Sequence, residues 1–192
     1  MVANPSHWSV DFEAYLRYEL EAEKKHELID GEIVAMAGAS LRHNVLCGRV
    51  HDAIRPSLGD GPCLLERSDQ MLAVDTTQKG WVAYYPDLAV YCSGAVHPQA
   101  SETRVNPSLL VEVTSKSTEK KDRGVKLEDY LQIPTLEEYV IVSHKRQELA
   151  VWTRGASGWA QQLVTTGTLR LRSGASIDVD RLFADLPALS ER

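Results

Sequence analysis

The amino-acid sequence predicts an α/β fold with a mixed β-sheet flanked by helices. Three observations support this class. Apolar residues recur at helical spacing in three segments, short apolar runs bounded by turn residues lie between and after them, and the order is helix, hairpin, helix, strands, helix, strands. No repeat, low-complexity stretch or linker divides the chain, so we expect one domain over residues 1–192.

The N-terminal segment predicts a helix followed by a β-hairpin. Apolar residues recur every three or four positions over Ser9–Glu23, and Ser9 can cap that helix. Asp30-Gly31 is a strong two-residue turn signal, so we expect a hairpin from His26 to Ala37. In that hairpin Glu27 and Glu32 lie on the same side of the sheet.

The middle of the chain predicts a second helix and a series of short strands. The helix spans Ser40–Leu58, and Pro56 and Gly59 help to end it. The expected strands are Cys63–Val74 (one long or two short strands), Asp87–Tyr91 and Ser108–Thr114, with a turn at Lys79-Gly80.

The last third predicts one more long helix and then strands joined by polar turns. The helix spans Thr118–Gln132, and Pro134 stops it. The expected strands are Tyr139–Val142, Leu149–Arg154, Trp159–Val164 and Ile177–Val179, with a turn at Gly155–Gly158 and a helical turn near Arg181.

Composition and charge limit the classes of protein and partner. Hydrophobic residues make up 43% and charged residues 25%, as in ordinary soluble proteins. No apolar run approaches the ~18 residues that span a bilayer, and Met1–Ser9 lacks a signal-peptide pattern, so we expect a cytoplasmic location. A net charge of −6 argues against broad non-specific binding to nucleic acid but leaves room for a local patch.

The cysteines and helix histidines give weaker signals. Cys47, Cys63 and Cys92 are odd in number and contain no C-x-x-C pair, so we expect free thiols rather than a zinc site or a disulfide framework. His43, Cys47 and His51 recur every four residues on the second helix. The two histidines lie ~12 Å apart along the helix axis, so at most one adjacent pair could ligate a metal.

Two carboxylates in apolar strands indicate a metal site. Glu112 lies in the middle of Leu109–Thr114, a segment apolar on both faces. Burying its charge costs several kcal/mol unless a cation, a basic side chain or a proton neutralises it. Asp87 follows Pro86 at the entrance of another apolar strand. Two such strands can place both carboxylates around a hard cation such as Mg²⁺.

These residues also resemble a known family. Pro86-Asp87, a spacer and Glu112-Val113-Thr114 are similar to the motif of the PD-(D/E)XK nuclease superfamily. The wider pattern resembles the Uma-type family of restriction-endonuclease-like proteins, through Glu27–Glu32, Pro86–Val90, Leu110–Ser115, Ser117-Thr118, Asp122, Lys126, Tyr130 and Glu138–Val142. The resemblance covers roughly Phe12 to Trp152 and implies a restriction-endonuclease-like mixed sheet flanked by helices.

The sequence departs from the superfamily motif at one position. Thr114 stands where a lysine is expected two residues after the acid. In the Uma-type family the basic residue comes from the following helix, and Lys126 is the matching position. Asp122, Lys126 and Tyr130 are spaced by four and line one helical face. The family also tends to have a histidine near the start of the second helix, which would bring His43 toward the site.

The resemblance implies a metal-dependent mechanism of phosphodiester hydrolysis. Mg²⁺ or Mn²⁺ would be held by Asp87, Glu112 and the backbone carbonyl of Val113. Lys126 would stabilise developing negative charge or orient the attacking water. Glu27 would be a further ligand or an outer-shell acid. The implied function is cleavage of DNA, with a homodimer supplying two sites through the strands that carry Trp152 and Trp159.

Other interpretations stay open at this point. A buried salt bridge between Glu112 and Lys126 would suit an inactive nuclease-fold binding or regulatory protein, and a metal-dependent phosphoesterase on a small substrate is another possibility. The only basic cluster could meet a phosphate backbone or be a solvated helix start. It contains Lys116, Lys120, Lys121, Arg123 and Lys126. Trp81, Tyr84 and Tyr85 are expected to pack in the core or a dimer contact rather than to stack on bases.

Overall fold

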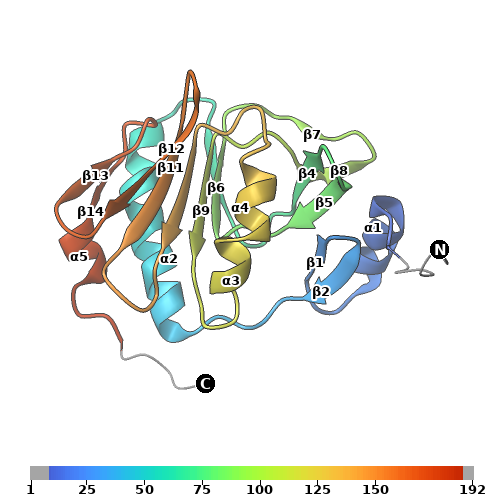
Figure 1. The fold of residues 1–192 in the computed structure, drawn as a ribbon, viewed down its shortest axis with the longest axis horizontal. Helices are drawn as coiled ribbons and strands as arrows, with labels where there is room; N and C mark the ends of the chain where they lie inside the picture. Colours follow the sequence, from blue (N-terminus) through green and yellow to red (C-terminus); the bar gives the residue numbers. More distant parts are fainter. Residues whose placement is uncertain (1–8, 188–192) are drawn as a thin grey trace, which may run out of the picture.

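The computed structural model describes residues 9–187 and confirms the α/β class (Figure 1). Two six-stranded β-sheets contain most of the strands of the described chain. The central sheet contains, in spatial order, β12 (Gly158–Val164), β11 (Leu149–Gly155), β10 (Glu138–Val142), β9 (Leu109–Val113), β6 (Leu88–Tyr91) and β3 (Leu64–Arg67). Its strands pair antiparallel except for β9 with β10, which are parallel, so the sheet is mixed as predicted.

The central sheet is covered by helices on both faces. Helix α2 (Leu41–Ile54) packs on one face, where Leu46 and Val50 join Val111 in one apolar cluster. Helix α4 (Val125–Tyr130) packs on the other face, where Tyr130 joins Leu110. Figure 1 shows α2 behind the sheet and α4 in front of it. Double coverage explains why β9 is apolar along its whole length and buried throughout.

The second sheet, here called the N-terminal sheet, carries the predicted hairpin. It contains, in spatial order, β2 (Glu32–Ala35), β1 (His26–Ile29), β5 (Gly80–Tyr84), β4 (Leu72–Thr76), β8 (Ala100–Arg104) and β7 (Val96–His97). Both turn residues, Asp30 and Gly31, have positive φ, as a tight hairpin turn requires. The register pairs Glu27 with Val34 and Ile29 with Glu32, so Glu27 and Glu32 share a side as predicted.

The first two helices lie where the sequence predicts them but differ in their bounds. The first, α1 (Phe12–Glu21), begins after Asp11, whose side chain accepts a hydrogen bond from the Ala14 N–H and takes the capping role expected of Ser9. Helix α2 begins after Ser40 as predicted, and a 3₁₀ turn, η1 (Arg55–Leu58), continues it. Among residues 9–187, no helix has the length and apolar character needed to cross a membrane.

The predicted third helix is broken into two. Helix α3 (Glu119–Asp122) and helix α4 are separated at Gly124, where a single helix over Thr118–Gln132 was expected. A Cβ atom at Gly124 would lie 2.8 Å from the carbonyl oxygen of Lys120, so the close backbone approach needs glycine. The break turns the chain without separating Asp122 from Lys126, whose charged groups still meet.

Two short strands lie in Cys63–Val74, as one of the two alternatives expected, and several other strands were not predicted. The segment Cys63–Val74 contributes β3 to the central sheet and β4 to the N-terminal sheet. Strands β5, β7 and β8 were missed. So was β13 (Thr168–Arg170), which pairs with β14 (Ser176–Asp178) ahead of α5 (Val179–Phe183). Strands β7 and β13 are short and β8 is polar, so their alternation is weak without the partner strand.

The expectation that Cys63 and Cys92 are free thiols is wrong, because the two form a disulfide. Strands β3 and β6 pair antiparallel with Leu64 opposite Tyr91, and this register brings Cys63 opposite Cys92. Twenty-nine residues separate the two cysteines in sequence, so only the strand pairing reveals their proximity. Cys47 remains free and half-buried.

Candidate metal centre

The structure brings Asp87 and Glu112 together at one end of the central sheet. Strands β6 and β9 are antiparallel with Leu88 opposite Val111, so the next pair in register is Asp87 with Glu112. Residues opposite each other in this way project to the same side of the sheet. The Val113 N–H also donates to Asp87 Oδ2 at 2.8 Å, which fixes the carboxylate beside β9.

Glu112 is buried and held by two side chains from α4. Its Oε1 accepts hydrogen bonds from Lys126 Nζ at 3.0 Å and from the Tyr130 hydroxyl at 2.9 Å. Burial raises the pKa of the Glu112 carboxyl well above its ordinary value, and the neighbouring carboxylates add to that effect while Lys126 opposes it. An ionised Glu112 therefore needs positive charge near it.

Lys126 is surrounded by acids. Its Nζ lies 2.8 Å from Glu27 Oε1 and 3.8 Å from Asp122 Oδ1, in addition to its contact with Glu112. Burial alone lowers the pKa of a lysine, but these three carboxylates outweigh it and hold the pKa of Lys126 above its ordinary value. The ammonium therefore stays charged, and α4 delivers it to the acids, where it forms the buried Glu112–Lys126 ion pair that the sequence left open as an alternative.

Four carboxylates share this region with two lysine ammoniums. Lys121 Nζ is 3.6 Å from Glu27 Oε2, and Lys126 contacts Glu27, Glu112 and Asp122. Asp87 is the fourth carboxylate. When all six groups are ionised, their net charge is −2.

Both carboxylate oxygens of Asp122 are buried without a hydrogen-bond partner, and burial raises the pKa of Asp122 to about 6. An oxygen-rich, under-neutralised donor set of this kind fits a hard divalent cation such as Mg²⁺ or Mn²⁺.

Helix α2 adds His43 to the same site. Ser40 caps the helix by accepting a hydrogen bond from the His43 N–H, and the ring Nε2 lies 3.2 Å from Asp87 Oδ2. Burial lowers the pKa of His43, but the hydrogen bond and charge of Asp87 outweigh it and the net pKa is raised.

Cys47, one turn further along α2, places Sγ 3.5 Å from His43 Nδ1. The regular four-residue spacing signalled this pair but not its meeting with Asp87. His51 instead lies beside Asp52.

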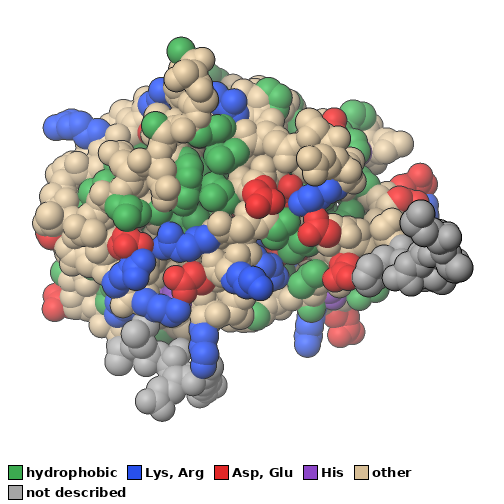
Figure 2. Space-filling view, in the orientation of Figure 1, with side chains coloured by type: hydrophobic (Ala, Val, Ile, Leu, Met, Phe, Trp, Pro, Cys, Tyr) green, Lys and Arg blue, Asp and Glu red, His purple; other side chains and the backbone are tan. Residues whose placement is uncertain are grey.

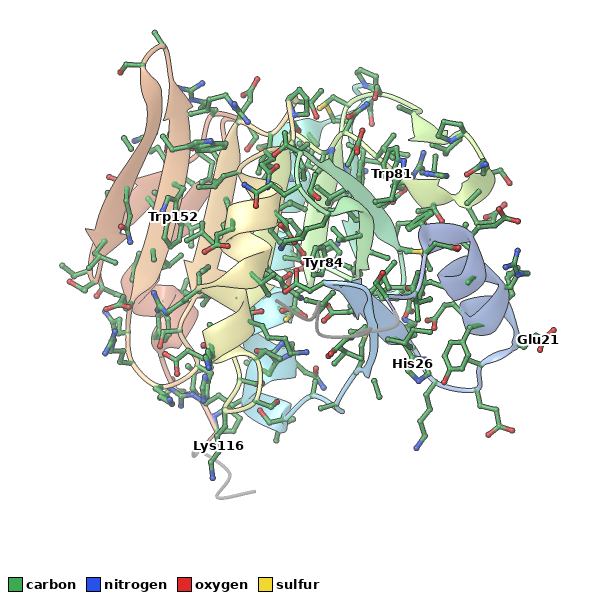
Figure 3. The ribbon with its side chains drawn as sticks, turned by 45° about the vertical axis from the view of Figure 1, so that its right-hand side comes forward. Glu21, His26, Trp81, Tyr84, Lys116 and Trp152 are labelled. Carbon is green, nitrogen blue, oxygen red and sulfur yellow. A yellow bond between two sulfur atoms is a disulfide. The ribbon has the colours of Figure 1, made fainter. Side chains whose placement is uncertain are left out.

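These side chains line a cleft of about 730 Å³. Glu27, His43, Asp87, Glu112, Val113 and Lys126 all contribute to its wall. In Figure 3, Tyr84 lies at the centre of the molecule between α4 and the β1–β2 hairpin, with the Lys126 ammonium 5.6 Å from the centre of its ring. Lys24, Lys25, Lys121 and Arg67 also line the cleft and bring positive charge to it.

The predicted basic cluster divides into exposed and engaged residues. Lys116 and Lys120 are exposed, and Figure 3 shows Lys116 projecting into solvent below α3. Arg123 pairs with Glu148 at 3.1 Å, and Lys126 is buried. Figure 2 shows lysine and arginine side chains gathered with acidic ones in the lower half of this face. Of the predicted cluster, only Lys116 and Lys120 are fully exposed, so it does not form a broad basic surface.

The aromatic residues of the 81–85 segment and Trp152 pack inside the described chain. Tyr84 and Tyr85 are buried, and Trp81 contacts Phe12, in agreement with the packing interpretation. Trp152 stacks on Tyr139 within the same chain. Pairing of the C-terminal strands with a second copy stays a prediction.

Paired acids at one end of a mixed, helix-flanked sheet, with a lysine reaching them from the next helix, define a protein of the restriction-endonuclease-like class. The chain belongs to the Uma2 family: the family model, described as "Putative restriction endonuclease", matches residues 12–186. A Synechocystis protein described as uncharacterized is 33% identical over 177 residues, which cover 91% of each chain. A second Synechocystis protein with that description is 34% identical over 129 residues, 67% of this chain and 71% of the relative.

A solved structure shares the fold. It is described as a "putative nuclease belonging to DUF820" from Anabaena variabilis and superposes with a TM-score of 0.72. The similarity covers 90% of this chain and 96% of that one, at 13% sequence identity. The restriction-endonuclease-like fold expected from the sequence is thereby confirmed.

Proposed function

We propose that this protein is a divalent-metal-dependent endonuclease, formed by one restriction-endonuclease-like domain, that hydrolyses DNA phosphodiester bonds. The observation that supports the proposal most strongly is the cross-strand placement of Asp87 opposite Glu112 beside a cleft. Family membership and the shared nuclease fold support the same reaction class.

Asp87, Glu112 and the backbone carbonyl of Val113 are the proposed ligands of Mg²⁺ or Mn²⁺. When bound, such an ion polarises a phosphoryl oxygen and lowers the pKa of a bound water. Asp87 is fixed by the Val113 N–H and by His43, and Glu112 by Lys126 and Tyr130, so both carboxylates are oriented before an ion arrives.

Lys126 takes the place of the motif lysine that Thr114 replaces. Its ammonium reaches Glu112 from α4, on the face of β9 that carries the carboxylate, and there it can stabilise negative charge on a phosphate. The contact of Glu27 with Lys126 supports an outer-shell role, in which Glu27 positions the lysine. We propose Asp87, Glu112, Lys126 and Glu27 as the functional set.

The proposed substrate sets the expected partner, assembly and compartment. Lys24, Lys25 and Lys121 at the cleft, with exposed Lys116 and Lys120 nearby, can contact a DNA backbone without a strongly basic surface. A homodimer would bring two clefts to the two strands. We also propose a cytoplasmic location, where the reducing thiol pool would favour opening of the Cys63–Cys92 disulfide.

A plasmid-cleavage assay with Mg²⁺, with Mn²⁺ and with EDTA tests the proposal. We expect nicking or linearisation that needs the metal and is abolished in Asp87→Asn and Glu112→Gln. Lys126→Met should lower the rate by about 10²–10³-fold, as loss of a charge-stabilising group does. Asp52→Asn is the matched control, because its side chain is 82% exposed on α2 and contacts His51 rather than the cleft.

Three outcomes would contradict the proposal. Metal-dependent turnover of a small phosphodiester with no cleavage of plasmid or single-stranded DNA would assign the site to a phosphoesterase. DNA binding without cleavage under any metal would indicate an inactive nuclease-fold module. Cleavage that is equal in wild type and Asp87→Asn would show a contaminating nuclease.

A further inference from the structure

Three different metal-binding side chains converge beside the proposed carboxylate site. His43, Cys47 and Asp87 each offer one ligand atom, and these atoms lie within 4.8 Å of one another. His43 Nε2 is 3.2 Å from Asp87 Oδ2 and 4.0 Å from Cys47 Sγ. All three residues line the cleft, so an ion could reach them from solvent.

These separations are close to those of a tetrahedral metal site. Zinc binds imidazole nitrogen and carboxylate oxygen at ~2.0–2.1 Å and thiolate sulfur at ~2.3 Å, so tetrahedral angles put nitrogen and oxygen ~3.3 Å apart and nitrogen and sulfur ~3.6 Å apart. The observed nitrogen–oxygen separation of 3.2 Å already matches, and Cys47 Sγ, which is 4.0 Å from the nitrogen and within 4.8 Å of an Asp87 oxygen, would move closer to both. The cleft leaves room for water as a fourth ligand.

The donor types select a metal other than the one proposed for hydrolysis. Mg²⁺ prefers oxygen ligands, whereas imidazole together with thiolate favours Zn²⁺ and other later transition metals. Helix α2 presents His43 and Cys47 one turn apart, a spacing that places two ligands on one helical face. Cys47 is half-buried and outside the disulfide, so its thiol is available.

We propose that His43, Cys47 and Asp87 form a binding site for Zn²⁺ or a similar thiophilic ion, and that this ion inhibits the metal-dependent hydrolysis. Binding forms a metal–sulfur bond at Cys47 and releases the thiol proton to the solvent. Asp87 belongs to both sets, so an ion held by His43 and Cys47 withdraws this carboxylate from the hydrolytic cation. The inhibitory part rests on the proposed function, but the binding site does not.

A cobalt titration of the whole chain tests the site without an activity readout. Co²⁺ is added under reducing conditions to the wild type, Cys47→Ser and His43→Ala, and Zn²⁺ is then used to displace it. We expect one Co²⁺ per wild-type chain, with a thiolate-to-cobalt charge-transfer band that Zn²⁺ abolishes. Cys47→Ser should lose the band and weaken Zn²⁺ binding by more than the ~10–100-fold that loss of an outer-shell partner costs.

His51→Ala is the matched control, because His51 is the next residue in the same four-residue series of α2 but lies beside Asp52. It should bind both ions as the wild type does. Thermal unfolding without metal verifies that each variant is folded. A wild-type cobalt spectrum without thiolate character, or equal Zn²⁺ affinity in wild type and Cys47→Ser, would overturn the proposed site.

The inhibitory part has its own readout. In plasmid cleavage with Mn²⁺, we measure for each variant the ratio of the rate with Zn²⁺ to the rate without it. We expect Zn²⁺ to lower this ratio in the wild type at concentrations at which the ratio stays close to one in Cys47→Ser. Equal inhibition of both would place Zn²⁺ on the carboxylates alone and refute shared use of Asp87. If no chain cleaves DNA but the cobalt band is present and depends on Cys47, the proposed function fails and the metal site stands.

Discussion

The buried lysine offers the sharpest test of the electrostatic account. Lys126 is 4% exposed, and its ammonium lies 2.8 Å from Glu27 and 3.0 Å from Glu112. In Lys126→Met the apolar stem is retained, but Glu27, Glu112 and Asp122 lose their shared cation. Removing one partner from a buried ion pair destabilises a protein by about 3–5 kcal/mol, because the remaining charge is buried and unpaired.

The expected loss is large enough to measure in two ways. Urea unfolding at neutral pH without divalent metal should show a free energy of unfolding lower by about 3–5 kcal/mol. In a chain of this size the melting temperature should fall by roughly 6–20 °C, at about 2–4 °C per kcal/mol. Lys120→Met is the matched control, because Lys120 is exposed on α3, and it should change stability by less than about 0.5 kcal/mol.

A double variant separates the ion pair from packing. If the cost of Lys126→Met comes from unpaired carboxylates, Glu112→Gln combined with Lys126→Met should cost less than the sum of the two single changes. A loss below about 1 kcal/mol in Lys126→Met, the value typical of an exposed pair, would refute the inference that this ammonium neutralises the buried acids.

Three further predictions concern the rest of the fold. Changing Cys63 and Cys92 to serine should lower the free energy of unfolding by about 3–4 kcal/mol, because their disulfide closes a loop of about 30 residues. Equal urea midpoints of the wild type with and without a reductant would contradict this. Burial lowers the pKa of His97, so its stabilising contribution is complete above the unfolded pKa of about 6.5 and is lost as pH falls through the folded pKa. The urea midpoint should therefore fall more steeply between pH 8 and pH 5 in the wild type than in His97→Phe. Parallel curves would show that His97 is not the source of the pH dependence. Gly124→Ala should destabilise the protein by about 1–3 kcal/mol, because the new Cβ would lie 2.8 Å from the Lys120 carbonyl oxygen. Gly48→Ala, which has open space around it in α2, should instead stabilise the protein by about 0.5–1 kcal/mol. Melting curves that reverse this order would show that no backbone clash occurs at position 124.

The elements that the sequence predicted well have local signals. Asp30-Gly31 fixes the register of its hairpin through the two-residue turn alone. Glu112 stands out because a carboxylate in an apolar strand is costly wherever that strand lies. Ser40 starts α2 through a hydrogen bond to a residue three positions away. In each case the physical cause acts over a few neighbouring residues, so the pattern is visible in one sequence.

The features that were missed depend on tertiary pairing. The Cys63–Cys92 disulfide follows from the register of β3 with β6, which joins segments far apart in sequence. Cys47 joins other metal-binding side chains only because His43 of α2 meets Asp87, the residue before β6. The helix break at Gly124 depends on a backbone contact with Lys120 that glycine tolerates, and one glycine does not reveal it in advance.

The central claim is that Asp87 and Glu112 hold a divalent cation together, and calorimetric titration with Mn²⁺ measures this most directly. The account predicts that the wild type and Asp52→Asn bind Mn²⁺ equally and that both Asp87→Asn and Glu112→Gln lose the binding heat while remaining folded. Wild-type protein that takes up no Mn²⁺, or binding that persists in both carboxylate variants, would contradict it.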